Sequence, residues 1–218
     1  MLRKRRGRGS RNAKSLYVFP AREAIVKAAS RCIIKLGHAR LSTRAVAAEA
    51  GVNQSLIHYY FGTKEKLMLA VLEQMNEALF KRQTAMYDSP LTFAEKWAQA
   101  CLFYEQDLAS GYTRLLMELS GLGISNPAVG LEVRKIRSQW FALLQHVAKE
   151  ALEHFGITSV AAEEVAAYVM SFWVGMDLGM MLGVPEEEGH YRHSLRTFER
   201  FLRWLEAEKA AGRRPVIQ

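Results

Sequence analysis

Apolar side chains recur at helical spacing along almost the whole chain, and the pattern never changes to the alternation that is typical of strands. From residue 21 onward, glycine, proline and small polar residues separate successive stretches of this kind. The sequence therefore predicts an all-α protein. Its 218 residues, half of them hydrophobic, are enough for a small domain joined to a larger one.

The first predicted helices are short. An apolar stripe over residues 25–36 is followed by a segment in which Ser42 and Thr43 can cap a helix that runs to residue 50. Gly51 is placed to end that helix in a left-handed turn, and Asn53 can cap the next one, to residue 61. Longer helices are predicted over residues 64–86, 92–109, 112–122, 127–155, 159–182 and 190–210.

Positive charge gathers at the front of the chain. Residues 1–62 contain 13 Lys or Arg and two acids, a net charge of +11, whereas the remainder carries −3. Residues 1–19 alone hold seven basic residues and no acid, which predicts a disordered basic arm. This asymmetry indicates a polyanionic partner, either nucleic acid or an anionic membrane. Attached to a DNA-binding module, the arm would add affinity for phosphates.

Residues 42–61 form a helix-turn-helix pattern, with two short helices joined at Gly51. Adjacent positions on a helix cannot all face one core, so the ring residues at positions 58–61 must divide between two sides. With Ile57 turned inward, Tyr60 and Phe61 can lean into the core. The outward side then presents Gln54, Ser55, His58 and Tyr59. Exposed rings beside amide and basic groups favour DNA as the partner.

The stretch LSTRAVAAEAGVNQSLIHYYFGTKEKLMLAVL, residues 41–72, resembles the signature of the TetR family of bacterial transcriptional regulators, and the resemblance extends over residues 21–73. It implies a helix-turn-helix DNA-binding domain over residues 20–66 and a helical effector-binding and dimerisation domain over residues 67–218. It also implies a cytoplasmic homodimer that represses transcription at a near-palindromic double-stranded DNA operator. A small-molecule effector would release the DNA, and no cofactor is implied.

The resemblance assigns DNA contacts position by position. Thr43 and Lys64 match phosphate contacts, and Arg44 matches a position that often reads a base edge, where a guanidinium suits guanine O6 and N7. The predicted contact set is Thr43, Arg44, Gln54, Ser55, His58, Tyr59 and Lys64. Two positions depart from the family: Leu56 stands where many members have a small or hydroxyl residue, and His58 where tyrosine is common. Leu56 is therefore left out of the set.

The family also places an effector pocket and a dimer surface in the larger domain. Predicted pocket residues are Trp97, Phe103, Tyr104, Met117, Trp140, Trp173 and Met180, whose aromatic and thioether groups favour an apolar or aromatic effector over a strongly charged one. The predicted dimer surface lies on the last two long helices, where small and aromatic residues form stripes. Its residues are Phe172, Gly175, Met176, Gly179, Phe198, Phe201, Leu202 and Leu205.

Three other features of the sequence bear on its class: a long apolar segment, two cysteines and a pair of histidines. Residues 165–184 carry a single charge, Asp177, and are about as long as a membrane span, but acids flank them and a helix buried in a bundle is favoured. Cys32 and Cys101 are too few for a secreted disulfide scaffold. His190 and His193 have no evident third metal ligand, and no catalytic motif indicates an enzyme. A non-specific architectural DNA-binding protein and an all-α enzyme remain the alternatives.

Overall fold

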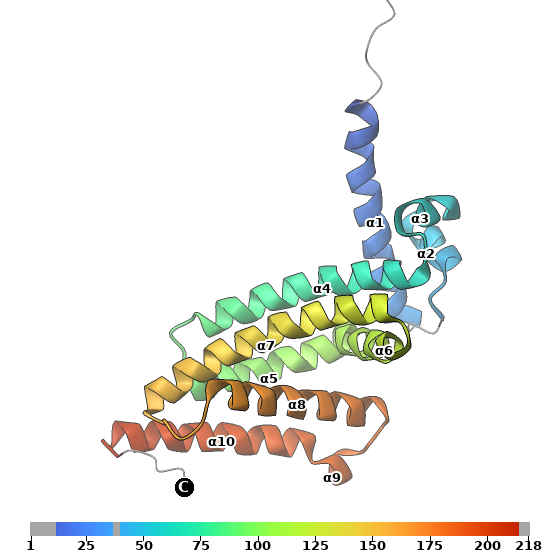
Figure 1. Ribbon diagram of the computed structural model, residues 1–218. Coiled ribbons are helices and arrows are strands. Elements are labelled where there is room, and N and C mark those ends of the chain that lie inside the picture. Colours follow the sequence, from blue (N-terminus) through green and yellow to red (C-terminus); the bar gives the residue numbers. More distant parts are fainter. Residues whose placement is uncertain (1–11, 37–39, 214–218) are drawn as a thin grey trace, which may run out of the picture. The chain divides into compact units, whose positions relative to one another are not determined.

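The computed structural model describes residues 12–36 and 40–213, and every regular element within them is a helix (Figure 1). The predicted all-α class is therefore confirmed. The chain divides into two compact units between residues 74 and 75. The first unit holds α1 (Asn12–Leu36), α2 (Thr43–Ala50), α3 (Gln54–Phe61) and the start of α4 (Lys64–Tyr87), a helix that continues into the second unit. The domain boundary predicted after residue 66 stays a prediction.

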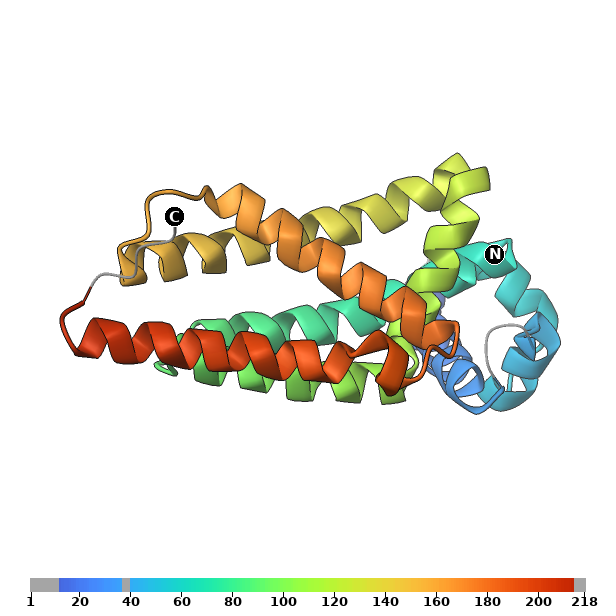
Figure 2. The same ribbon diagram turned by 90° about the horizontal axis from the view of Figure 1, so that it is seen from below.

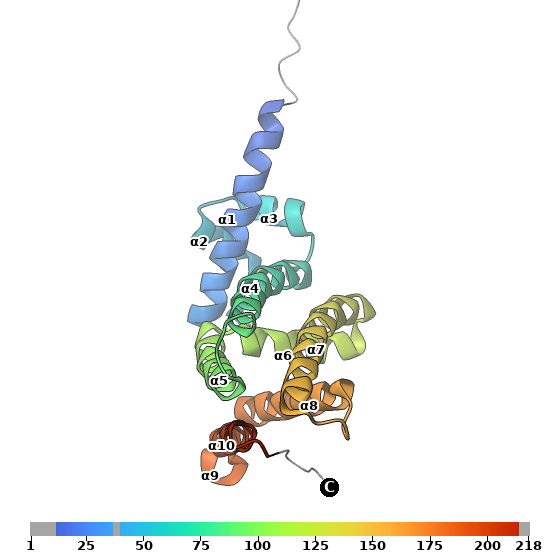
Figure 3. The same cartoon turned by 90° about the vertical axis from the view of Figure 1, so that its left-hand side faces the viewer.

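The second unit is a bundle of long helices. Besides the end of α4, it contains α5 (Phe93–Ser110), α6 (Tyr112–Ser125), α7 (Pro127–Phe155), α8 (Ala162–Met181), α9 (Glu186–Gly189) and α10 (Tyr191–Ala210). Helix α7 packs along both α6 and α8, and α10 packs along α5. Figure 2 shows α8 and α10 on the side of this unit that faces the viewer. Figure 3 looks almost along α10, with α8 beside it.

Helix α1 begins earlier than the sequence predicted. It starts at Asn12, inside the segment expected to be a disordered arm, and residues 1–11 of that segment lie outside the described residues. The glycines that favoured disorder stand only at positions 7 and 9, so none interrupts the helix from Asn12 onward. Helix α1 thus includes residues 12–19 of that segment.

The core of the first unit comes from α1 and from the inward sides of α2, α3 and α4. Its buried side chains from α1 are Ile25, Val26, Ala28, Ala29, Cys32 and Ile33. Glu49 on α2 forms ion pairs with two residues of α1, Arg31 at 2.6 Å and Lys35 at 3.5 Å. These pairs link the two helices. The hydrogen bond from Arg31, followed by the charge of Lys35, holds the pKa of the Glu49 carboxyl below its usual value.

Two glycines lie against each other where helices α6 and α7 pack together. A Cβ atom at Gly130 would lie 2.7 Å from the carbonyl oxygen of Gly123, and one at Gly123 would lie 2.8 Å from Cα of Gly130. Both obstacles are backbone, which cannot rotate away. These glycines therefore set the distance between the two helices, one of which carries Arg137 and Trp140 into the second unit's interior.

Local sequence explains where the long helices begin. Thr92 and Glu95 form a reciprocal capping box at the start of α5, and Asn126 caps α7 immediately before Pro127. Apart from the early start of α1, the predicted helices agree with the observed ones to within a few residues, but α9 was not predicted. Within the described residues, no helix has the length and apolar character needed to cross a bilayer.

Candidate nucleic-acid interface and effector cavity

The turn between α2 and α3 is built as the sequence predicted. The hydroxyl of Ser42 accepts a hydrogen bond from the amide of Ala45 at 3.1 Å and caps α2. Gly51 ends that helix with φ of 65° and ψ of 32°, the left-handed region in which glycine carries no steric penalty. Asn53 then caps α3 by accepting from the amide of Ser55 at 2.9 Å. The two helices are thus held at a fixed angle by local hydrogen bonds.

Helix α3 has one buried side and one exposed side. Ile57 and Phe61 are buried, and the guanidinium of Arg22 on α1 lies 5.3 Å from the Phe61 ring centre. Tyr60 is half-buried between them and the surface. On the other side, Tyr59 is 75% exposed, its ring meeting Tyr60 edge-on at 5.1 Å. Gln54, Ser55 and His58 are exposed beside it.

The remaining predicted contacts lie close to this exposed side of α3. Gln54 donates a hydrogen bond from Nε2 to Oγ1 of Thr43 at 2.8 Å, so the starts of α2 and α3 meet. Arg44 follows Thr43 and is exposed, and Lys64 is half-buried in the first turn of α4. Five of the seven predicted residues are therefore exposed on the first unit, and Thr43 and Lys64 are half-buried; the contacts with DNA stay a prediction.

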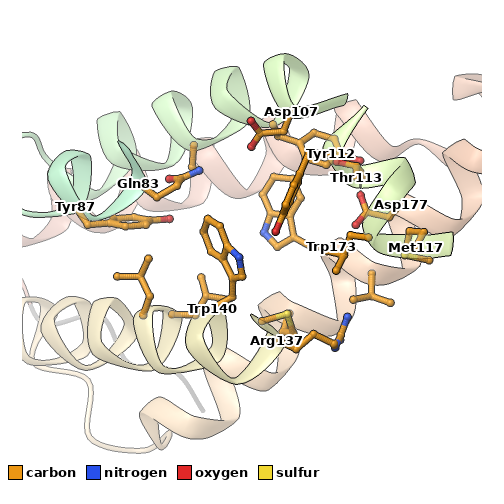
Figure 4. Close-up of a pocket in the computed structure, with 17 residues that line it drawn as sticks. Gln83, Tyr87, Asp107, Tyr112, Thr113, Met117, Arg137, Trp140, Trp173 and Asp177 are labelled. Carbon is orange, nitrogen blue, oxygen red and sulfur yellow. Dashed lines mark hydrogen bonds between the residues drawn. The ribbon is translucent and has the colours of Figure 1, made fainter. Parts of the chain in front are cut away.

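A cavity of about 140 Å³ lies within the second unit, among α4, α5, α6, α7 and α8 (Figure 4). Its wall combines five aromatic rings with aliphatic and polar side chains. Those rings are Tyr87, Tyr104, Tyr112, Trp140 and Trp173, joined by the polar side chains of Gln83, Asp107, Thr113, Arg137 and Asp177. A mostly apolar enclosure with a few convergent polar groups is typical of a small-molecule site.

Asn76 on α4 fixes two of these rings. Its Oδ1 accepts hydrogen bonds from the hydroxyl of Tyr112 at 2.8 Å and from Nε1 of Trp140 at 2.7 Å. Its Nδ2 donates to Oε1 of Gln139 at 3.0 Å. Because the polar edges of both rings meet the same buried amide, their orientation is set before any ligand enters. Asn76 lies outside the cavity wall and acts by positioning the rings.

The two carboxylates of the cavity differ in their partners. Asp107 pairs with Arg82 at 2.7 Å, and the same guanidinium lies 4.1 Å from the ring centre of Phe103. Burial raises the pKa of the Asp107 carboxyl, and the hydrogen bond from Arg82 opposes that shift. Asp177 instead accepts a hydrogen bond at 2.7 Å from the hydroxyl of Tyr104. Burial raises its pKa to about 6, against the opposing effects of the Tyr104 hydrogen bond and the Arg137 charge.

Four of the seven predicted pocket residues line this cavity: Tyr104, Met117, Trp140 and Trp173. Trp97 lines neighbouring depressions and donates from Nε1 to the carbonyl of Leu195 at 2.9 Å. Met180 sits behind Tyr104, whose hydroxyl contacts its sulfur at 3.5 Å. Phe103 packs under Arg82. These last three are therefore corrected to supporting positions.

Sequence reasoning missed the polar residues of the cavity. Of these, Asp177 had a visible signal, because it is the single charge in an otherwise apolar stretch. Such a residue is costly to bury, so its position alone pointed to an interior site. Asn76, Asp107 and Arg137 had no comparable signal, since other polar or charged residues lie within three positions of each in the sequence.

The predicted dimer surface must be redrawn. Met176 is 2% exposed and Leu205 is 2% exposed, and Leu202 is also buried, so these side chains already belong to the interior of the unit. Gly179 is buried against Tyr191, whose hydroxyl occupies the place of a Cβ atom. These four residues lie on the inward sides of α8 and α10. The spacing of apolar residues in the sequence did not distinguish the inward sides from the outward sides.

The outward sides of α8 and α10 form a different apolar surface. Between them runs a groove lined by Trp97, Tyr168, Val169, Phe172, Ser194, Thr197, Phe198 and Phe201. Phe201 and Trp204 stack at 5.8 Å between ring centres and are 39% and 48% exposed. Phe172, Gly175, Phe198 and Phe201 of the predicted set remain on or beside this surface, with Gly175 itself exposed. Tyr168 and Trp204 were not predicted.

Metal binding finds no support in the part of the chain that the structure describes. No group of three or more His, Cys, Asp or Glu side chains there is arranged to hold an ion. His190, with φ of 50°, is the residue that ends α9, and both it and His193 are exposed.

Comparison with known proteins identifies the family. The family model described as bacterial regulatory proteins, tetR family, matches residues 25–71, which include α2, the turn at Gly51 and α3. The first unit therefore carries a DNA-binding domain of the TetR family. Transcriptional regulators of this family are not enzymes, so the match favours a regulator over the enzyme alternative.

Relatives of the TetR family extend the match. The regulator BetI of Brucella anthropi is 31% identical over 116 residues, which are 45% of this chain and 60% of that protein. A crystal structure from Saccharomonospora viridis, described as that of a transcriptional regulator in complex with choline, gives a TM-score of 0.68 at 20% identity and covers 83% of this chain and 95% of that one. The regulator FadR of Bacillus subtilis, solved with stearoyl-CoA, gives a TM-score of 0.62 at 17% identity and covers 83% and 96%. At these identities the two structures establish a shared fold.

Proposed function

We propose that this chain is a ligand-responsive transcriptional repressor, which binds a near-palindromic operator as a homodimer and releases it when a small effector enters the cavity of the second unit. The observation that carries the proposal is the division of α3 into a buried apolar side and an exposed polar side. A repressor acts where the chromosome lies, so we expect it in the bacterial cytoplasm.

The exposed side of α3 suits the major groove of DNA. Gln54 stands at the N-terminal end of the helix, where a recognition helix meets base edges, and Arg44 at the start of α2 can reach a guanine. Thr43 and Lys64 stand at helix starts, where free backbone amides add to the binding of phosphate. Ser55, His58 and Tyr59 complete the surface. Thr43 and Gln54 would exchange their mutual hydrogen bond for contacts with DNA.

Pairing of two chains would supply two such helices. A single recognition helix reads only a few base pairs, so modules of this kind generally act as two-fold dimers. The outward surface of α8 and α10 supports this arrangement, because it exposes the stacked Phe201 and Trp204 beside an apolar groove. Two helices from each chain would then form a four-helix bundle.

The cavity supports a small-molecule effector. The two structures with the same fold were solved with choline and with stearoyl-CoA, ligands of unlike chemistry, so the fold alone does not specify the effector. The ring-rich wall of the cavity agrees with the apolar or aromatic effector expected from the sequence. Effector binding would favour a spacing of the two DNA-binding units that no longer fits successive major grooves, a shift of population between two states.

Two variants test the DNA-binding surface. Arg44→Ala should weaken binding to the operator by about 1–3 kcal/mol and relax base preference at one position, whereas Lys64→Ala should weaken binding to every duplex alike. Mobility-shift titrations on cognate and scrambled duplexes, at one salt concentration, measure both effects. If the Arg44 variant binds both duplexes as wild type does, Arg44 reads no base.

The same titrations separate a regulator from an architectural protein. A non-specific binder would bind cognate and scrambled duplexes equally even without substitution, and footprinting would show uniform coating in place of one short protected site.

A further inference from the structure

The cavity of the second unit combines two features that bear on the charge of its ligand. Its wall presents the rings of Tyr112, Trp140 and Trp173, which Figure 4 shows gathered around one space. The Trp173 ring also packs against the ring of Tyr104, with centres 4.7 Å apart at an angle of 54°. The face of an aromatic ring carries partial negative charge and attracts a cation placed over it.

The second feature is a carboxylate that lacks an ionic partner. Among the described residues, Asp107 has Arg82 at 2.7 Å, whereas Asp177 forms no ion pair within 4.0 Å. The residue is only 9% exposed, and it lines the cavity. One of its oxygens accepts from Tyr104. Arg137 lines the same cavity and influences Asp177 through its charge, without an ion pair between the two.

We propose that the effector carries a substituted ammonium group, which the aromatic rings enclose and the carboxylate of Asp177 neutralises. This inference rests on the proposed function, because it treats the cavity as the effector site. It also departs from the expectation that an apolar or aromatic effector is favoured over a strongly charged one, since neither carboxylate was predicted to line the pocket.

An alkylated ammonium fits these surroundings better than other groups. Its alkyl groups suit an apolar wall, and its charge is spread over a surface that needs few hydrogen bonds, as in aromatic cages for quaternary ammonium ligands. A neutral apolar ligand would leave the Asp177 carboxylate buried without a counter-charge, which is costly. An anion would meet both that carboxylate and the negative ring faces. The cavity, about 140 Å³, approaches the size of about 150 Å³ that accommodates benzene in an engineered protein.

The ammonium group could belong to a simple cation or to a zwitterion. In a zwitterion, the negative end would find Arg137, which lines the same cavity. Both ligands share the chemistry that the rings and Asp177 recognise, and the experiment below distinguishes them.

Calorimetric titration of the full chain tests the proposal with tetramethylammonium chloride and tert-butanol, a pair similar in shape that differs in charge. Tetramethylammonium should bind, and tert-butanol should bind at least tenfold more weakly. Asp177→Asn keeps the acceptor for Tyr104 and removes the charge, so it should weaken tetramethylammonium binding at least tenfold. Trp173→Leu should weaken it while leaving tert-butanol binding in place. The control Glu132→Gln, a surface carboxylate paired with Lys135, should bind as wild type does.

Three results would overturn the proposal: no tetramethylammonium binding by the wild-type chain, equal binding of both probes, or unchanged binding in a folded Asp177→Asn variant. Tighter binding of N,N,N-trimethylglycine, lost in Arg137→Gln, would support the proposal with a zwitterion as the source. Mobility-shift titration of the same preparations keeps the two hypotheses apart. A chain that binds DNA specifically but ignores tetramethylammonium contradicts the ammonium inference and leaves the proposed regulator standing.

Discussion

Substitution of the glycines between α6 and α7 tests whether their backbone contact holds the second unit together. Gly130→Ala would place a Cβ atom 2.7 Å from the carbonyl oxygen of Gly123, which is backbone and cannot move aside alone. The helices must separate by several tenths of an ångström to restore an ordinary contact. Overpacking of this kind costs about 1–3 kcal/mol. Replacing glycine by alanine within a helix raises the free energy of unfolding by about 0.5–1 kcal/mol. The net expectation is a loss of about 0–2.5 kcal/mol in the free energy of unfolding.

Helix α6 provides the matched control. Gly121 is exposed on the helix that carries Gly123, the partner of Gly130, and a Cβ atom there would meet nothing within 4 Å. Gly121→Ala should therefore raise the free energy of unfolding by about 0.5–1 kcal/mol, because only the helix-propensity gain remains. Urea unfolding followed by far-ultraviolet circular dichroism, at one protein concentration, measures both variants. Shifts of the same sign and size would refute the close contact. Because α7 carries Trp140 and Arg137, the Gly130 variant should also bind cavity ligands more weakly than the Gly121 variant.

Three further predictions concern the turn, the cavity and the dimer. Gly51→Ala should lower the free energy of unfolding by about 1–2 kcal/mol, because Gly51 has φ of 65°. Gly51→Asn should lower it less. Equal losses in urea unfolding would argue against the left-handed turn. Tetramethylammonium should bind roughly tenfold more weakly at pH 5 than at pH 7.5. The reason is that the Asp177 carboxyl, whose pKa is raised to about 6, is mostly protonated at the lower pH and mostly ionised at the higher one. Calorimetry should find no such pH dependence in Asp177→Asn. In that range Tyr104 and Tyr112, whose pKa values burial raises, stay neutral, and Asp107 stays beside Arg82; Arg137 lines the same cavity. Phe201→Ser combined with Trp204→Ser should convert a dimer to a monomer, as measured by light scattering at micromolar concentration. The control Ile124→Ser, which removes an apolar residue 90% exposed on α6, should stay dimeric. A dimer in both variants would place the interface elsewhere.

The helix-turn-helix could be predicted from the sequence because its determinants are local. Ser42, Gly51 and Asn53 act within three or four residues of their own positions, through caps and a left-handed turn. The same holds for Asn126 and Pro127 at the start of α7. The short helix α9 escaped prediction, because four residues give no periodic signal.

The cavity and the dimer surface could be predicted only in part, because they depend on how helices distant in the sequence pack. Trp97 and Trp140 are both half-buried tryptophans, yet one donates to the carbonyl of Leu195 and the other to Asn76 beside the cavity. Along α10, Phe201 and Leu202 both read as apolar stripe, and only the packing of α5 against one side separates an exposed ring from a buried one. Helical spacing identifies which residues share a side, but not which side faces the interior.

Selection of bound sequences from a random pool of duplexes, with the full chain as the only protein, tests the central claim most directly. The account predicts enrichment of a short near-palindrome whose half-sites lie about one helical turn apart, roughly 34–36 Å, and relaxed preference at one symmetric pair of positions with Arg44→Ala. Recovery of a pool with no preferred sequence, or of a site that Arg44→Ala reads as the wild-type chain does, would contradict it.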